Sequence, residues 1–427
     1  MKLKQKAISG VKWNTASTFT VALFSLLKIS ILTRFLEKGD FGLMALVMFV
    51  LGFTNIFVDM GLTTAILHKQ KISKNEFSSL YWLNVGFSII LYVLILLIAP
   101  VFSRFYEETE LINLIPIMGV NILLSGFGRQ FKTVIQKALR FKLISIVNII
   151  SATISLIISI VLSFKGYGVY ALVFAALGQE VVSNMLFIIF GRANHGVSFF
   201  FSYQLTKPFL KIGGFQVGGQ IVNYFNRDID TLIVGKFFGV EILGGYNLAK
   251  QLVFRPASIL NPIITNVSAP ILAKLQDDLE VLKKNYLKLV NIIATINIPI
   301  YILVIVFAPF IVRIMYGEGF DNIVSLVRIL SVYMMYRAIG NPIGSLVIAT
   351  GKTHLEFVWN LVILFFMPLA VFIGSQFTIE AVAFSIVICS SLLFIPSWYM
   401  LVKKMIGASL KEYVKSLKPN FNVFFQK

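Results

Sequence analysis

Long apolar runs separated by short polar segments make up most of this sequence. A helix that crosses the hydrocarbon core of a membrane needs about 20 mainly apolar residues. The chain therefore reads as an all-α polytopic membrane protein with about twelve transmembrane helices and a basic, weakly apolar tail at 403–427. The predicted spans are 12–36, 41–67, 77–101, 112–138, 143–164, 167–190, 208–238, 241–273, 286–311, 323–350, 355–374 and 379–402.

Basic residues gather on one side of the predicted spans. If the chain starts in the cytoplasm, 26 of its 38 Lys and Arg residues fall in cytoplasmic segments and 5 in the opposite loops. Loops rich in Lys and Arg stay on the cytoplasmic side during insertion. The pattern predicts a multi-pass protein of the bacterial inner (plasma) membrane, surrounded by membrane lipid, with both termini in the cytoplasm.

Composition narrows the function classes. The chain is 57% hydrophobic and 13% charged, which is too apolar for a soluble domain. The net charge of +19 follows from the basic cytoplasmic loops, so no nucleic-acid partner is expected. With the single cysteine Cys389 and no Cys/His cluster, we expect no metal and no other cofactor. The longest outer loop, Ser103–Glu110, is too short to hold a catalytic domain, so we expect no enzyme and no catalytic residues.

The two halves of the chain resemble each other. Arg34-Phe35-Leu36 ends the first span and Lys236-Phe237-Phe238 ends the seventh, and Gly42 and Gly244 open the spans that follow, at the same offset of 202 residues. This repeat predicts two pseudo-symmetric six-helix lobes, 1–200 (spans 1–6) and 201–402 (spans 7–12). A parallel repeat places the substrate site between its lobes, around a central cavity.

Corresponding faces of the first and seventh spans are polar. On the seventh, polar residues are spaced by 4, 3, 4 and 3, which places them on one helical face. We expect both faces to line the central cavity, with Asp230 paired to Lys28 or Arg227; alternatively, these groups only hold helices together in a static bundle. The predicted polar cavity stripe comprises Asn14, Thr18, Ser25, Gln216, Gln220 and Asn223.

Cations outnumber acids inside the predicted spans. Arg and Lys bind phosphate groups well, so a cavity with surplus positive charge suits an anionic substrate. The alternative for each cation is snorkelling to the membrane surface. The predicted substrate-binding residues of this cationic cavity are Lys28, Arg227, Lys250, Arg255, Arg328 and Arg337. The predicted ion-coupling or salt-bridge residues are Asp59, Glu180, Asp228 and Asp230.

Six segments have a recognisable pattern: AISGVKWNTAS near the start, LTRFLEKGDFGLMAL, FVDMGLTTAIL (Phe57–Leu67), NYFNRDIDTLIVGKFFG (Asn223–Gly239), GYNLAKQLVFRPASILNPI (Gly245–Ile263) and ATGKTHLEF (Ala349–Phe357). These segments resemble the polysaccharide transporter branch of the MOP exporter superfamily, which comprises the Wzx-type flippases, and they are similar to colanic-acid-exporter-like members. Members commonly have fourteen spans, whereas this sequence has twelve and a tail that resembles the approach to a thirteenth.

The resemblance implies a MATE-like fold and transport by alternating access. The substrate would be an undecaprenyl-diphosphate-linked oligosaccharide, the repeat unit of an O-antigen (lipopolysaccharide), capsule or exopolysaccharide, and the partners would include other polysaccharide-assembly proteins. Two alternatives stay open: a drug/cation antiporter of the same superfamily and a membrane-embedded polysaccharide-assembly enzyme.

Overall fold

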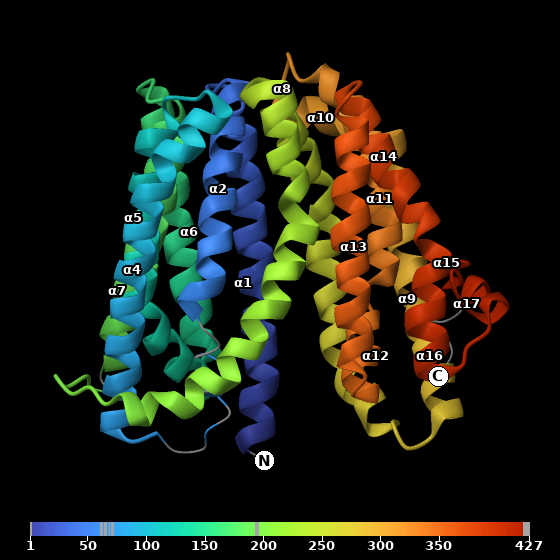
Figure 1. Cartoon of the computed structure of the whole chain (residues 1–427), viewed down its shortest axis with the longest axis horizontal. Helices are drawn as coiled ribbons and strands as arrows, with labels where there is room; N and C mark the ends of the chain where they lie inside the picture. The colour runs from blue at the N-terminus through green and yellow to red at the C-terminus, as the bar shows by residue number, and fades with distance from the viewer. Residues whose placement is uncertain are drawn as a thin grey trace. The chain divides into compact units, whose positions relative to one another are not determined.

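A computed structural model shows a chain that is helical almost throughout (Figure 1). The structure describes residues 2–59, 63, 66–67, 69, 72–192 and 196–421. Within these ranges, the side chains of 2–8, 11, 59, 210–216 and 266–267 lie outside the description. No strand occurs in the described ranges, which confirms the predicted all-α class.

The chain divides into two compact units. The first comprises residues 1–224 and 239–244, and the second comprises 225–238 and 245–427. The predicted lobes, 1–200 and 201–402, describe the sequence repeat and are not the same as these two units. The boundary between the lobes stays a prediction. All three boundaries between the units lie in one helical segment, α8 (Tyr203–Lys274), so a single stretch of chain contributes to both units.

The first unit is a bundle in which α5 packs against α4 and α7, α6 packs against α1 and α7, and α2 packs against α5. Figure 1 shows α4, α5 and α7 together at the left of the view. Its helices are α1 (Lys2–Leu32), α2 (Lys38–Asp59), α4 (Lys74–Tyr106), α5 (Leu111–Lys137), α6 (Phe141–Phe164) and α7 (Val169–Arg192).

The second unit contains several short helices besides its long ones. In it, α11 packs against α9 and α14, and α13 packs against α14. Its elements after α8 are α9 (Leu279–Val306), α10 (Ala308–Tyr316), η1 (Asp321–Ile323), α11 (Val324–Gly340), α12 (Ile343–Thr350), α13 (Thr353–Gly374), α14 (Ile379–Leu392), α15 (Phe394–Ser397), η2 (Trp398–Lys403), α16 (Lys404–Ile406) and α17 (Leu410–Ser416).

Ten helical segments of the described chain are long and apolar enough to cross a membrane, or eleven if Ile379–Leu392 and Phe394–Ile406, bent by 42°, form one span. One of the ten, Val217–Lys274, has 58 residues. A straight helix of that length would reach about 87 Å, nearly three times the hydrocarbon thickness. Its backbone breaks at Gly239, with φ 76° and ψ 175°, a conformation open to glycine. α8 therefore holds two predicted spans, 208–238 and 241–273. The predicted run 41–67 ends among residues outside the description, and each of the other runs lies on helix over most of its length.

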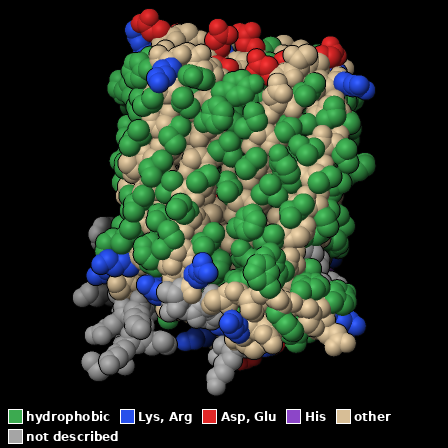
Figure 2. Space-filling model, turned by 90° about the vertical axis from the view of Figure 1, so that its left-hand side faces the viewer, with side chains coloured by type: hydrophobic (Ala, Val, Ile, Leu, Met, Phe, Trp, Pro, Cys, Tyr) green, Lys and Arg blue, Asp and Glu red, His purple; other side chains and the backbone are tan. Residues whose placement is uncertain are grey.

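The outer face of the first unit is suited to lipid. Figure 2 shows a broad hydrophobic band on this face, with acidic side chains gathered at one end and most Lys and Arg side chains at the other. On α4, Ile90, Val93 and Leu97 are all exposed, and Leu97 is 63% exposed. A broad apolar surface marks contact with lipid or with another protein, and helices long enough to cross a membrane favour lipid here. The chain is a multi-pass membrane protein.

A reciprocal backbone contact within the first unit bears out the predicted repeat. A Cβ atom on Gly42 would lie 1.8 Å from the carbonyl oxygen of Val240, and a Cβ on Gly244 would lie 1.8 Å from that of Lys38. Residues 38 and 240, like 42 and 244, are separated by the offset of 202 found in the sequence. The two glycines thus make the same close approach in opposite directions, as a two-fold repeat requires.

The segment predicted as a tail forms structure of its own. α17 starts with a capping box between Ser409 and Glu412. The Asn291 side chain on α9 donates to the carbonyls of Ser416, at 3.0 Å, and Lys418, at 2.7 Å. Tyr413 is buried in the core of the second unit. Residues 404–420 are therefore packed on the second unit.

Candidate functional site

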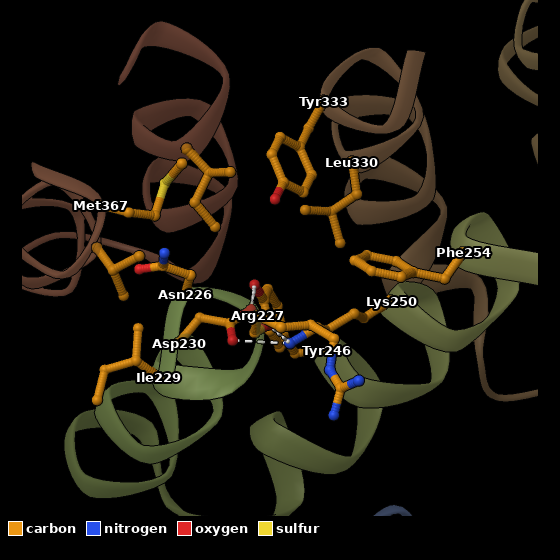
Figure 3. A pocket seen from close by; sticks show the side chains of 12 residues that line it. Asn226, Arg227, Ile229, Asp230, Tyr246, Lys250, Phe254, Leu330, Tyr333 and Met367 are labelled. Carbon is orange, nitrogen blue, oxygen red and sulfur yellow. Dashed lines mark hydrogen bonds and ion pairs between the residues drawn. The ribbon is translucent and has the colours of Figure 1, made fainter. Parts of the chain in front are cut away.

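A pocket with charged side chains on one side and apolar walls on the others lies inside the second unit (Figure 3). Its empty space of about 340 Å³ includes open solvent at its mouth. Both limbs of α8 supply its charged side chains, because the break at Gly239 sends the chain back on itself. Helices α11, α13 and α14 supply apolar and aromatic walls. The lining residues are Asn226, Arg227, Ile229, Asp230, Tyr246, Lys250, Phe254, Leu330, Tyr333, Met367, Val371 and Ile386.

Lys250 is the centre of this site. Its ammonium donates to Asp230 Oδ1 at 2.7 Å, to Asp228 Oδ1 at 3.3 Å and to the Arg227 carbonyl at 2.8 Å. An ammonium has three N–H donors, so these three acceptors use all of them. Lys250 was predicted to bind substrate, but in this structure it joins the two limbs of α8.

Asp230 is held from three sides. Besides Lys250, it accepts from the Tyr246 hydroxyl at 2.6 Å and from the Thr231 backbone N–H at 3.0 Å. Asp230 and Lys250 are each only 8% exposed. A buried carboxylate is tolerated when it is paired and hydrogen-bonded in this way. Asp230 therefore acts as a salt-bridge partner here, one of the two roles predicted for it.

Arg227 and Asp228 form the outer part of the network. Arg227 Nε lies 2.7 Å from Asp228 Oδ2, while Asp228 Oδ1 faces Lys250. The Arg227 side chain is 52% exposed, whereas Lys250 and Asp230 are buried. Arg227 is thus the most exposed side chain among these four ion-paired residues.

Arg337 adds a third cation from α11. Its Nη1 donates to the Tyr333 hydroxyl at 2.7 Å, and its guanidinium lies 5.2 Å from the centre of the Phe254 ring. Stacking on an aromatic face holds the guanidinium plane in place. The charges of Asp228 and Asp230 lie within electrostatic range of Arg337. Arg227, Lys250 and Asp230 line the pocket, whereas Arg337 and Asp228 lie beside it, and together these five groups carry one surplus positive charge.

The other predicted cations lie elsewhere. Arg328 is exposed and donates to the Ile305 carbonyl at 3.3 Å, and Arg255 lies within electrostatic range of Tyr316. Neither lines the pocket. Lys28 belongs to the first unit, where it donates to Ser155 Oγ at 3.3 Å. The predicted Lys28–Asp230 pair would join the two units and stays a prediction.

The predicted polar stripe is largely accessible where the structure describes it. Asn14, Thr18, Gln220 and Asn223 are exposed, and Ser25 is half-buried. The side chains of Gln216 and Asp59 lie outside the described residues. That this stripe lines a cavity stays a prediction.

Glu180 belongs to a separate polar group in the first unit. It accepts from Asn184 Nδ2 at 2.9 Å, and the charge of Lys132 lies within electrostatic range. Arg129, also near Lys132, donates to Asn55 Oδ1 at 3.3 Å. A carboxylate among these groups suits a salt-bridge role as well as an ion-coupling role.

Sequence reasoning missed the aromatic and amide lining of the pocket. Tyr246 precedes Lys250 by four residues, Phe254 follows it by four, and Tyr333 precedes Arg337 by four. Residues four apart share a helix face. Aromatic residues at this spacing from intramembrane cations were therefore a usable signal. Asn226, which donates to the Asn360 carbonyl at 2.9 Å, had no such signal.

Comparison with known proteins gives consistent matches. The sequence pattern of the family described as polysaccharide biosynthesis protein matches residues 31–325. The chain is 29% identical over 418 residues to the lipopolysaccharide biosynthesis protein WzxC of Escherichia coli K12, covering 98% of this chain and 85% of that protein. It is 28% identical over 425 residues to the teichuronic acid biosynthesis protein TuaB of Bacillus subtilis 168, covering 99% and 86%.

Solved structures share the fold. The lipid II flippase MurJ in an inward closed conformation matches with a TM-score of 0.75 at 15% identity, covering 96% of this chain and 90% of that one. An inward-facing multidrug resistance MATE family transporter of the MOP superfamily matches with a TM-score of 0.72 at 14% identity, covering 90% and 94%. The two-lobed MATE-like fold expected from the sequence is confirmed.

Proposed function

This chain belongs to the polysaccharide biosynthesis protein family, and from that premise we propose that it is a flippase for an undecaprenyl-diphosphate-linked oligosaccharide. It moves the repeat unit of an O-antigen, capsule or exopolysaccharide across the bacterial inner membrane. The step is transport, with no covalent chemistry. Both chain termini lie in the cytoplasm, where the lipid-linked precursor is assembled by other proteins of the pathway that act as partners.

The observation that carries this proposal is the charge of the pocket in the second unit. Arg227, Lys250 and Asp230 line it, Asp228 and Arg337 lie beside it, and these five charges sum to one surplus positive charge. The side chain of Arg227 is 52% exposed. Arginine binds phosphate through two parallel N–H donors. A diphosphate linked to a lipid is a doubly charged group that needs such donors when it leaves water. The surplus positive charge argues against a site for cationic drugs.

The need to move a polar sugar through hydrocarbon explains why the protein requires a polar route. Each polar group of a sugar that enters hydrocarbon without a hydrogen bond costs several kcal/mol, as estimated from transfer to apolar solvents. A polar route through the protein removes this cost, while the apolar lipid tail stays in the bilayer. The polar side chains that line it are Asn14, Thr18, Ser25, Gln216, Gln220 and Asn223. Lys28, Arg255, Arg328 and Arg337 join Arg227 in guiding the diphosphate, and Asp59 or Glu180 couples transport to an ion.

The test is flipping of a fluorescent, short undecaprenyl-diphosphate oligosaccharide in proteoliposomes that contain the full chain. We expect the unchanged chain to accelerate flipping, and Arg227→Ala and Lys28→Ala each to slow it about tenfold, because a charged hydrogen bond to phosphate contributes about 1.5–3 kcal/mol. The matched control is Arg313→Ala, because Arg313 is 72% exposed and lies outside the pocket. Correct insertion without any flipping would refute the proposal, and uptake of a cationic dye against a proton or sodium gradient would instead support the antiporter.

A further inference from the structure

One carboxylate beside the pocket is shared between two cations that line it. Asp228 Oδ2 lies 2.7 Å from Arg227 Nε, and Asp228 Oδ1 lies 3.3 Å from Lys250 Nζ. Its neighbour Asp230 is different, because it is fixed by Lys250, Tyr246 and a backbone N–H. Asp228 is also more accessible: its side chain is 23% exposed, against 11% for Asp230.

We propose that Asp228 is an internal counter-ion of the substrate site, which occupies Arg227 when no substrate is bound and gives it up to the diphosphate of the substrate. This inference rests on the proposed function. It assigns to Asp228 a positioning and release role that differs from ion coupling. The Asp228 carboxylate occupies the position at Arg227 that a phosphate oxygen of the substrate takes, so the two compete for the same guanidinium.

The cost of an unpaired charge explains why an empty site needs such a group. A guanidinium in a membrane-embedded pocket without a counter-ion is costly, and the cost is reduced by a nearby carboxylate. When the diphosphate takes Arg227, Asp228 keeps Lys250 as its second partner, and their separation of 3.3 Å can shorten. Neither the bound nor the empty state then leaves a carboxylate without a cation.

The same competition promotes release. A flippase must bind its substrate on one side and let it go on the other, so a site that binds too tightly becomes slow. Differences in affinity between closely related sites appear mainly in the dissociation rate. By competing for Arg227, Asp228 lowers affinity and raises the rate of release.

The experiment measures affinity and turnover separately. Binding of inorganic diphosphate to the purified full chain in detergent is followed by calorimetry, and flipping of the undecaprenyl-diphosphate oligosaccharide is followed in proteoliposomes. The variants are Asp228→Asn, which removes the charge, and Asp228→Glu, which keeps it. The matched control is Asp321→Asn, because Asp321 is an exposed acid of the same unit outside the pocket.

Asp228→Asn is expected to bind diphosphate about fivefold more tightly, the size expected for a partly exposed ion pair. Its half-saturating lipid concentration and its maximal flipping rate should both fall. Asp228→Glu, which keeps the charge, should change both much less than Asp228→Asn, and Asp321→Asn should stay near the unchanged chain. General damage to the fold would weaken binding instead. Equal or weaker diphosphate binding by Asp228→Asn, or no diphosphate binding by any form, overturns the proposal. Tighter binding by Asp228→Asn without lipid flipping by any form would support the counter-ion and refute the flippase.

Discussion

The two units hold their intramembrane polar groups in different ways. In the first unit, α6 presents buried serines to its neighbours, and Lys28 donates to one of them, Ser155. Two close-packed glycines, Gly42 and Gly244, bring backbones into direct contact there. In the second unit, Lys250 instead joins two carboxylates across the two limbs of α8.

The polar groups of the first unit serve helix packing, whereas the charges of the second unit can also bind an ion from outside. Small residues let helices approach closely and form a rigid seam with neutral hydrogen bonds. A network of opposite charges also holds helices together, but an ion from outside can compete with its members. The static-bundle alternative raised by the sequence describes the serine seam of the first unit well. The charge network of the second unit contains cations for which an anionic substrate can compete, as a transporter of anions requires.

The largest expected effect is on the buried pair of the second unit. Lys250→Met leaves Asp230 buried without its cation, and breaking such a pair costs about 3–5 kcal/mol. We expect a large fall in the thermal unfolding temperature of the purified chain in detergent. The double variant Lys250→Met with Asp230→Asn should recover much of it, because no buried charge remains.

Lys284→Met is the matched control for this prediction, because Lys284 is an exposed lysine of the same unit. A fall in unfolding temperature no larger for Lys250→Met than for Lys284→Met would contradict the view that charges hold this unit together.

The next effect tests the close packing of the first unit. Gly42→Ala places a methyl group 1.8 Å from the Val240 carbonyl oxygen, where backbone must move. Overpacking of this kind costs about 1–3 kcal/mol. Gly86→Ala on α4 meets no atom within 4 Å and should be neutral or slightly stabilising, since alanine favours a helix. Equal thermal stabilities of the two variants would show that the reciprocal glycine contact is not close.

The smallest effect concerns a charge outside the membrane-spanning segments. Hydrogen bonds from the Ser409 backbone N–H and hydroxyl lower the pKa of Glu412, which caps α17. A carboxylate whose pKa is lower in the folded state stabilises that state above its unfolded pKa, and this stabilisation is lost as the pH falls through the folded pKa. Hydrogen exchange of residues 410–416 should therefore rise below about pH 4.5, the ordinary Glu pKa.

Glu412→Gln removes the titrating group and should make this exchange independent of pH over the same range, after correction for its intrinsic rate. The Ser409 cap remains in that variant, so the helix can still form. An unchanged pH profile in Glu412→Gln would show that another group controls the docking of α17.

The sequence predicted the spans and the repeat because both depend on local properties. Bilayer thickness sets the length of each apolar run, so 208–238 and 241–273 could be recognised without knowing what they contact. The offset of 202 between Gly42 and Gly244 is likewise visible in the chain itself, and the reciprocal contact confirms it.

The predicted site residues and the observed pocket overlap in part. Arg227, Lys250 and Asp230 line one pocket, and that this pocket binds the substrate stays a proposal. Arg255 and Arg328 were included on charge alone, and the structure places them away from that pocket. Position along a span does not fix the direction of a side chain, because that direction depends on which neighbour the helix packs against.

The sequence by itself determined the class of this protein: its membrane spans, its two-fold repeat and its surplus of intramembrane cations. Only the tertiary structure decided which charges meet. Asp230 lies 20 residues from Lys250, and Asp228 lies 22 residues from it. They meet because the chain turns back at Gly239, where a left-handed φ that glycine adopts freely brings the two limbs of α8 together. That turn joins Lys250 to two carboxylates and leaves the guanidinium of Arg227 half-exposed in the pocket.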